Sequence, residues 1–461
     1  MRVKIDVKCE AKRYCMEHDS ETIFAPATPG GGAISVIRIS GEKAHQILDA
    51  VFCGQGREHA KLYHGYIEHE GKRIDEVMAV YFYAPRSYTG EDMAEIHCHG
   101  GAVTTSLVMR ALRDNGARLA EPGEFTKRAF LAGKMDLSAA GAVMELIGAN
   151  SAAGAVAALR QLSGGLFERI TAIQGKLTDA LAIIEAGLDY PEDDIEADVK
   201  RDALPLVIAA RDDTKRLYDT FASGRMLREG YNVVIAGRPN VGKSSLFNML
   251  LDKERAIVTH IPGTTRDAVD DTLYKDGVLI RLIDTAGLRE SADVVENIGI
   301  SRAKEAVKKA DMTLFVLDAS EGITDEDKEI FSALGGDTVI VLNKSDLPDK
   351  TSADEVKRIF GKEAVTVSAL KGEGRDKLLE LITPPEVSEI EDVVVTNERH
   401  FEILASVKES LDSAIESFDS ADLDCVAVDL KEAWNGLGAI TGVTVTEEII
   451  NSIFDKFCLG K

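Results

Sequence analysis

Residues 231–245 read YNVVIAGRPNVGKSS and decide the fold of the segment around them. The apolar run 233–236 predicts a buried strand, and the glycine-containing turn after it leads into a helical pattern. This order of strand, turn and helix is the setting of a phosphate loop, in which backbone N–H groups surround the phosphates. Lys243 would place a cation at the β and γ oxygens, and the Ser244 hydroxyl would bind Mg²⁺. The stretch therefore predicts a nucleotide site in an α/β domain.

The base is identified further along the chain by residues 343–346, Asn-Lys-Ser-Asp, which follow the apolar run 338–342. A carboxylate at Asp346 accepts both hydrogen bonds from the donor edge of guanine, whereas adenine offers no matching pair of donors. The motif therefore favours GTP over ATP.

Three further segments stand in the order that a GTPase requires. Residues 284–287, Asp-Thr-Ala-Gly, follow a strand pattern and would place a carboxylate near the metal and an N–H near the γ-phosphate. Residues 263–267, Gly-Thr-Thr-Arg-Asp, fit the first switch, and 368–370, Ser-Ala-Leu, fit the loop that closes over the base. A single motif would be a weak signal, but five elements in this order predict a GTPase.

The group that positions the attacking water is left open by these motifs. The residue after the Asp-Thr-Ala-Gly segment is Leu288, not the glutamine that orients water in Ras-like enzymes. Arg266 and Arg289 are candidates for an arginine finger, although solvation or a salt bridge in the switch is the commoner fate of such residues. Glu296 stands where the second switch is expected and would orient water directly or through a second water.

These motifs together resemble the MnmE (TrmE) family of tRNA-modification GTPases, and the resemblance covers nearly the whole chain. Within the nucleotide-binding segment it rests on GRPNVGKSSLFN, PGTTRD, DTAGLRE, the glutamate at 296 and NKSD. Outside that segment it rests on three blocks, which are 87–92 (SYTGED), 122–137 (PGEFTKRAFLAGKMDL) and 457–461 (FCLGK).

For the nucleotide site, the resemblance implies that K⁺ beside the phosphates replaces an arginine finger and that two G domains dimerise around it. Glu296 matches the catalytic glutamate of the family. The expected ligands are Asn240, Thr259, Ile261 and Thr264 for K⁺, and Ser244 and Thr265 for Mg²⁺. The GTP-binding positions are Asn240, Val241, Gly242, Lys243, Ser244, Ser245, Thr259, His260, Ile261, Pro262, Gly263, Thr264, Thr265, Asp284, Thr285, Ala286, Gly287, Asn343, Lys344, Ser345, Asp346, Ser368, Ala369 and Leu370.

For the N-terminal segment, the pattern alone reads only as a glycine turn, 28–32, that leads into a strand. The resemblance implies an α+β domain like the folate-binding aminomethyltransferases, which binds a 5-formyl or 5,10-methylene tetrahydrofolate and forms a homodimer. One departure is the triplet Gly-Gly-Gly at 30–32, where the family often has Gly-Arg-Gly. Cys458, in the terminal Cys-x-Gly-Lys motif, is a candidate catalytic residue. The expected folate contacts are Arg38, Glu95, Lys134 and Lys461.

The resemblance also implies a reaction and a partner. With the flavoprotein MnmG, in a heterotetramer, such proteins add a carboxymethylaminomethyl or aminomethyl group to C5 of the wobble uridine of certain tRNAs. The carbon would come from the tetrahydrofolate and the nitrogen from glycine or ammonium, while FAD belongs to the partner. A net charge of −24 argues against general nucleic-acid affinity, so tRNA would need a local basic surface or the partner's help.

A second function stays open, that of a GTP-switched ribosome-assembly or RNA-binding factor in which hydrolysis only times release. Factors of that kind usually carry a recognisable RNA-binding module. The sequence shows no Gly-x-x-Gly loop with KH-like surroundings after the GTPase segment. The folate-type blocks and the terminal motif also favour the enzyme.

Length and pattern predict three domains, because 461 residues exceed what one hydrophobic core normally serves. The predicted limits are 1–137 for the N-terminal domain, with 1–15 as an extra tail, and 138–230 plus 386–461 for one all-helical domain. A Ras-like G domain, 231–385, is inserted in the helical domain through adjacent chain ends. The six cysteines have no framework spacing and no apolar run spans a membrane, which predicts a cytoplasmic protein with no membrane partner.

Two minor features have competing interpretations. His97 and His99 would share one strand face, but two imidazoles without a spaced third and fourth ligand are weak support for zinc. Trp434, the only tryptophan, is expected in a helical core rather than as a stacking platform for bases.

Overall fold

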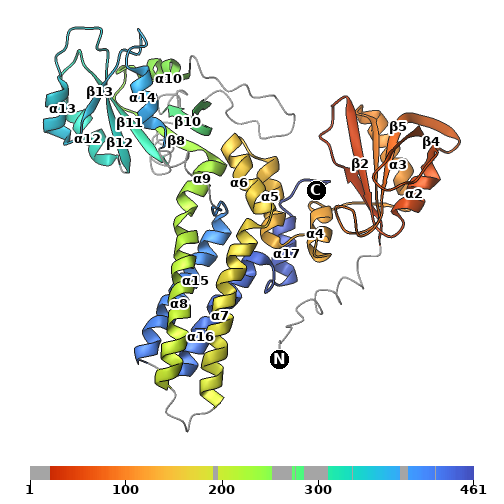
Figure 1. The fold of residues 1–461 in the computed structure, drawn as a ribbon. Coiled ribbons are helices and arrows are strands. Elements are labelled where there is room, and N and C mark those ends of the chain that lie inside the picture. The colour runs from red at the N-terminus through yellow and green to blue at the C-terminus, as the bar shows by residue number, and fades with distance from the viewer. Residues whose placement is uncertain are drawn as a thin grey trace, which may run out of the picture.

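The structure is a computed structural model that describes residues 21–189, 196–251, 272–275, 277–284, 310–334, 336–384, 393–420 and 422–460. A long helical bundle carries the G domain at one end, and the N-terminal α+β domain lies to its side (Figure 1). In the part of the chain that is described, no helix combines the length and the apolar composition needed to cross a bilayer.

The N-terminal domain is built on a seven-stranded sheet in the order β3-β4-β5-β6-β2-β1-β7, antiparallel except for the parallel β1–β7 pair. Helices α2 and α3 bury their apolar sides against one face, where Leu48 and Leu112 pack with Ile37 and Ile96. The strands alternate, so their polar residues point to the other face. The elements are β1 Ile23–Pro26, β2 Ile34–Ser40, α2 Ala44–Val51, β3 Phe52–Gly54, β4 Leu62–His69, β5 Lys72–Phe82, β6 Met93–His99, α3 Ala102–Asp114, β7 Arg118–Leu119 and α4 Glu124–Leu131.

A buried ionic network joins α4 to the sheet. The Arg128 guanidinium donates to Glu124 Oε1 at 2.8 Å and to Glu91 Oε2 at 3.2 Å, and its side chain is only 2% exposed. Glu91 also accepts a hydrogen bond from Ser40 Oγ at 2.7 Å. Buried charges persist when they are paired in this way. The two sequence blocks 87–92 and 122–137 are therefore held together by structure, independently of any ligand.

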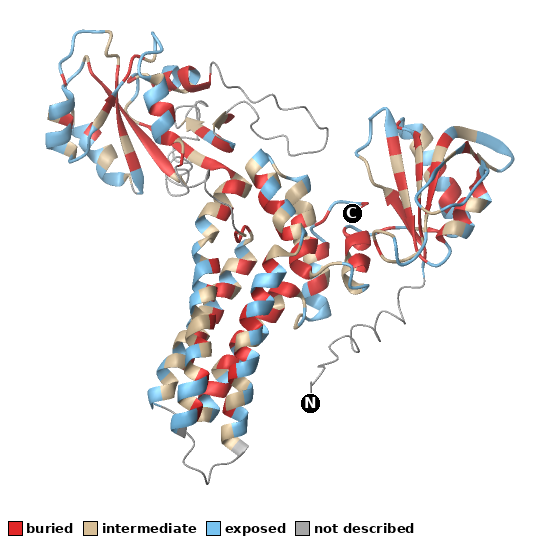
Figure 2. Cartoon of the chain, viewed as in Figure 1, coloured by how far each residue is buried: buried red, intermediate tan, exposed pale blue. Residues whose placement is uncertain are grey.

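The helical domain has a bundle of four long helices that share one apolar core, as the buried stripes in Figure 2 show. Two of them, α7 and α8, precede the G domain in sequence, and two, α15 and α16, follow it. Each packs an apolar stripe with helical spacing, for example Ile170, Leu177 and Ile184 on α7. The helices are α5 Leu137–Ile147, α6 Ala152–Leu162, α7 Gly165–Asp189, α8 Glu196–Asp219, α9 Phe221–Glu229, α15 Glu398–Ser420, α16 Leu423–Thr441 and α17 Glu447–Phe454.

The chain enters and leaves the G domain at one tight crossing. Gly224 on α9 lies so near the returning segment of chain before α15 that a Cβ there would be 2.0 Å from the carbonyl oxygen of Val395. Gln161 Nε2 donates to the carbonyl of Val394 at 2.8 Å, and Arg225 on α9 pairs with Asp311 in the G domain at 2.5 Å. The predicted domain limits stay predictions, although α5 begins at Leu137 and α9 ends at Glu229.

The G domain has a six-stranded sheet in the order β13-β12-β11-β8-β10-β9, parallel except for the β9–β10 pair. Residues of α10 and α14 cover one face and residues of α12 and α13 the other. In such sheets, ligands bind at the carboxyl ends of the strands. The elements are β8 Tyr231–Ala236, α10 Lys243–Leu251, β9 Thr272–Lys275, β10 Val278–Asp284, β11 Met312–Asp318, α12 Asp325–Ala333, β12 Asp337–Asn343, α13 Ala353–Phe360, β13 Ala364–Thr366 and α14 Arg375–Ile382.

Candidate functional site

The predicted order of strand, turn and helix is confirmed, so the turn predicted to be a phosphate loop lies between β8 and α10. Gly237, Asn240 and Gly242 have positive φ values of 150°, 65° and 93°, a backbone region that glycine adopts freely and asparagine more readily than most other residues. A Cβ on Gly242 would lie 2.3 Å from Nδ2 of Asn343. Glycine is therefore required at 242 both by the backbone conformation and by the Asn343 side chain, which belongs to the loop predicted to recognise the base.

The lysine of this loop is held by the loop itself. Lys243 Nζ donates to the carbonyl oxygens of Gly237, at 3.0 Å, and of Arg238, at 2.7 Å. The ammonium group thus lies inside the curve of the phosphate loop. That place suits a cation that binds β and γ oxygens.

Two of the expected metal-site residues meet at the start of α10. Ser244 Oγ donates a hydrogen bond to Asp284 Oδ2 at 3.0 Å, which brings the second residue of α10 to the end of β10. A hydroxyl and a carboxylate are oxygen ligands of the kind that Mg²⁺ prefers. The donor set fits this ion.

Residues 343–346, here called the base loop, are hydrogen-bonded to the phosphate loop through Asn343 and Lys344. Asn343 Nδ2 donates to the carbonyl of Val241 at 2.9 Å, while its Oδ1 accepts from the N–H of Ala369 at 3.1 Å. Lys344 Nζ donates to the carbonyl of Asn240 at 2.8 Å. The three segments that were predicted to hold phosphate and base are thus brought together at one edge of the sheet.

Asp346, the residue predicted to recognise guanine, faces the loop that closes over the base. Its Oδ1 accepts a hydrogen bond from Ser368 Oγ at 2.6 Å, and this bond lowers the pKa of the Asp346 carboxyl. The carboxylate is therefore ionised at neutral pH, as the recognition of two guanine N–H donors requires. Leu370, in the same loop, is 84% exposed.

Several predicted site residues lie outside the described part of the chain. They are Thr259, His260, Ile261, Pro262, Gly263, Thr264, Thr265, Thr285, Ala286, Gly287, Glu296 and Lys461, together with the open candidates Arg266, Leu288 and Arg289.

In the N-terminal domain, Arg38 and Glu95 are direct cross-strand neighbours on β2 and β6, with Arg38 Nε 3.1 Å from Glu95 Oε1. The guanidinium lies 4.9 Å from the ring centroid of Tyr88 and 5.7 Å from that of Phe125. Burial alone would raise the pKa of Glu95, but His97 and Arg38 outweigh it, and the pKa is lowered. The two residues form a charged, aromatic-backed site on the sheet face opposite α2 and α3.

Lys134 lies beside the loop that supplies Tyr88. Its Nζ donates to the carbonyl of Pro85 at 3.0 Å, and its Cγ would be 3.4 Å from a Cβ on Gly90. No hydrogen bond or ion pair joins the described side chain of Lys134 to the Arg38–Glu95 pair.

The terminal motif lies against the N-terminal domain. The N–H of Gly123 donates to the carbonyl of Cys458 at 3.4 Å. Gly460 has a φ of 88°, and a Cβ there would lie 2.0 Å from the carbonyl oxygen of Pro26 at the end of β1. Gly460 therefore packs against the end of β1, the strand next to β2, and Arg38 lies on β2. Cys458 is exposed.

The histidine pair is arranged as predicted but gains no support as a metal site. His97 and His99 share a face of β6, and Cys98 is buried on the other. His99 Nδ1 lies 2.7 Å from Asp75 Oδ1. Among the described residues, no group of three or more histidine, cysteine or acidic side chains has the arrangement to hold a metal ion.

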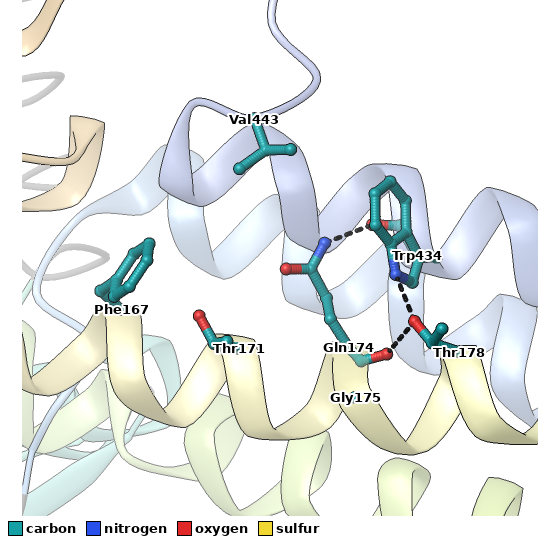
Figure 3. Close-up of a pocket in the computed structure, with 7 residues that line it drawn as sticks. All are labelled: Phe167, Thr171, Gln174, Gly175, Thr178, Trp434 and Val443. Carbon is teal, nitrogen blue, oxygen red and sulfur yellow. Dashed lines mark hydrogen bonds between the residues drawn. The ribbon is translucent and has the colours of Figure 1, made fainter. Parts of the chain in front are cut away.

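A groove of about 320 Å³ lies elsewhere, between α7 and the C-terminal half of α16 with the residues that follow it (Figure 3). Trp434 packs against the bundle core and is half-buried there, and its indole N–H donates to Thr178 Oγ1 at 3.1 Å. Gln174 Nε2 donates to the Trp434 carbonyl at 3.0 Å. The groove is lined by Phe167, Thr171, Gln174, Gly175, Thr178, Trp434 and Val443 and is separate from both sites described above.

The comparisons with known proteins cover nearly all of the chain. The family model "MnmE helical domain" matches residues 137–458, and "GTP-binding protein TrmE N-terminus" matches residues 22–134. A protein of Ligilactobacillus salivarius described as tRNA modification GTPase MnmE is 44% identical over 96% of this chain and 98% of its own length. Proteins of the same description from Natranaerobius thermophilus and Carboxydothermus hydrogenoformans are 43% and 44% identical, each over 96% of this chain and 99% of their own.

Proposed function

The chain is a GTP hydrolase that belongs to the MnmE family of tRNA modification GTPases, and from this premise we propose that K⁺ stimulates its hydrolysis of GTP in the service of wobble-uridine modification. The observation that carries the nucleotide part is the fastening of the base loop to the phosphate loop through Asn343 and Lys344. With Asp346 in place beside Ser368, this arrangement suits guanine and a triphosphate.

For the hydrolysis, we assign Ser244 and Thr265 to Mg²⁺, with the Asp284 carboxylate beside Ser244. Asn240, Thr259, Ile261 and Thr264 would hold K⁺, and Glu296 would orient the attacking water. The role of K⁺, when bound, is to offset the charge that develops between the β- and γ-phosphates. Asn240 lies in the turn between β8 and α10, where the phosphates would bind, with its backbone in the left-handed region.

The N-terminal domain would bind a tetrahydrofolate that carries the one-carbon unit, in its 5-formyl or 5,10-methylene form. The Arg38–Glu95 pair supplies hydrogen-bonding groups of both kinds, and Tyr88 and Phe125 supply aromatic surface. The seat of Gly460 on Pro26 supports a contribution from the terminal motif, in which Lys461 binds the folate and Cys458 takes part in the chemistry.

The modification itself would need partners. We propose that the chain forms a homodimer and, in the cytoplasm, a heterotetramer with the flavoprotein MnmG, whose FAD serves the redox step. Together they would add the carboxymethylaminomethyl or aminomethyl group to C5 of the wobble uridine of tRNA, with glycine or ammonium as the nitrogen source. The acidic charge of −24 is consistent with tRNA being held largely by the partner.

The test is reconstitution with unmodified tRNA, MnmG, GTP, FAD, methylene-tetrahydrofolate and either glycine or ammonium, followed by nucleoside analysis. Modified wobble uridine that requires both proteins and GTP is expected. Unmodified tRNA, together with GTP-dependent binding to ribosomal particles, would favour the assembly-factor alternative.

A further inference from the structure

Arg238, in the phosphate loop, makes side-chain contacts that have no role in the GTPase motifs described above. Its side chain is 14% exposed and leaves the loop towards α12, where Nε lies 2.7 Å from Asp327 Oδ1. Its Nη2 lies 3.3 Å from Glu321 Oε2. Burial would lower the pKa of the guanidinium, but the Asp327 carboxylate outweighs it and the pKa is raised.

Asp327 is a rigid anchor for this contact because its carboxylate, 0% exposed, is committed on both oxygens. Oδ2 accepts from the N–H of Thr324 at 2.9 Å and from its Oγ1 at 2.8 Å, which closes the capping box of α12. Oδ1 is the oxygen that receives Arg238. A buried carboxylate fixed in this way holds its partner in one position, since breaking the pair would leave a buried charge.

The chain segment from the end of β11 to the first turn of α12, which supplies Glu321 and Asp327, also contacts the loop of residues 343–346. Asp318, where the connection begins at the end of β11, has Oδ2 2.5 Å from Lys344 Nζ. Thr351 Oγ1, beyond the base loop, donates to the carbonyl of Glu321 at 2.7 Å. The segment 318–327 therefore contacts the phosphate loop through Arg238 and the base loop through Lys344.

The backbone of Arg238 is also part of the nucleotide site, since its carbonyl accepts the hydrogen bond from Lys243 Nζ at 2.7 Å. Because the Arg238 side chain is held by Asp327, the Arg238 peptide and the Lys243 ammonium that it binds are already in position before the nucleotide binds. Less conformational entropy is then lost on binding. We propose that Arg238 is a positioning residue, which preorganises the phosphate loop for nucleotide by its ion pair with Asp327.

The inference rests on the nucleotide site of the proposed function, but not on K⁺, folate or tRNA. Its test compares the wild type with Arg238→Ala in the full-length protein, with fluorescent GDP for affinity and dissociation rate and with GTP turnover for kcat and KM. Arg238→Ala should raise the Kd about tenfold, mainly through faster dissociation, and raise KM while kcat stays within about twofold. Glu321→Ala, which removes the 58% exposed outer partner, should change the Kd less than about twofold.

A double variant separates positioning from the cost of an unpaired buried charge. Arg238→Met with Asp327→Asn removes both charges, so it should unfold near the wild-type temperature and still bind GDP about tenfold more weakly. Wild-type affinity and dissociation rate for GDP in Arg238→Ala or in the double variant would overturn the inference. A wild-type protein that binds no GDP would contradict the nucleotide site itself, and the inference with it.

Discussion

The side-chain amide of Asn343 donates a hydrogen bond to the carbonyl oxygen of Val241 at 2.9 Å, which joins the loop predicted to select the base to the loop predicted to hold the phosphates. Asn343 and Val241 are each 1% exposed, so the Val241 carbonyl would not find water easily if this side chain were lost. Asn343 is therefore one of the two residues, with Lys344, whose side chains join these loops.

Asn343→Ala should weaken GDP binding by about tenfold or more, because the Val241 carbonyl loses a buried hydrogen bond and the N–H of Ala369 a partly buried one, and each buried loss costs about 1–3 kcal/mol. Lys362→Ala is a matched control, since Lys362 Nζ also donates to a backbone carbonyl on β12, that of Thr338 at 3.0 Å, away from the site. Titration with fluorescent GDP checks this. Equal affinities in the two variants would show that the link between the loops does not matter for binding.

Asp346→Asn should lower the affinity for guanine nucleotides by about tenfold to a hundredfold, because one N–H of guanine then faces an amide donor or a neutral acceptor instead of a carboxylate. Competition of GTP, xanthosine triphosphate and ATP against fluorescent GDP measures the change. Xanthine carries a carbonyl in place of the guanine amino group, so the variant should gain relative affinity for it. An unchanged order of affinities would mean that another residue reads the base.

Gly460→Ala should weaken the binding of 5-formyl-tetrahydrofolate more than about tenfold, because the new Cβ meets the Pro26 carbonyl at 2.0 Å and the tail must move. GTP turnover by the same protein should stay near wild type. Gly361→Ala is the control, as this glycine has a similar φ of 71° with open space around it. Wild-type folate affinity of Gly460→Ala, measured by isothermal titration calorimetry, would show that the C-terminal segment does not contribute to folate binding.

His400 should make the helical domain sensitive to acid. It is 4% exposed, its Nδ1 has no hydrogen-bond partner among the described residues, and burial lowers its pKa from 6.5 to about 3. Below about pH 6.5 the unfolded chain takes up a proton that the folded state refuses, so stability falls from there towards pH 3, by up to about 1.4 kcal/mol per pH unit.

The variant His400→Leu should lose this part of the pH dependence. Unfolding temperatures measured between pH 7.5 and 5.5 should therefore fall less steeply for the variant than for the wild type. Parallel curves for the two proteins would show that the imidazole does not stay neutral in the fold.

Structural features whose residues are close together in the sequence are predicted well, whereas contacts between residues far apart in the sequence are not. The stretch 231–245 yields β8, the loop and α10, because a local pattern carries all three. The pair of Arg238 with Asp327 was not predicted, since 89 positions separate them and Asp327 looks like any acidic residue in the first turn of a helix. The network of Arg128 with Glu91 was missed for the same reason, although both lie in blocks that the family resemblance had singled out.

The central claim, that K⁺ stimulates GTP hydrolysis at this site, is tested most directly by GTP turnover in KCl and in NaCl at equal ionic strength, with Glu296→Ala measured alongside. The account predicts strong stimulation by K⁺ in the wild type and loss of turnover in the variant under both salts, with GDP affinity retained. Equal rates in the two salts, with an active Glu296→Ala protein, would contradict it.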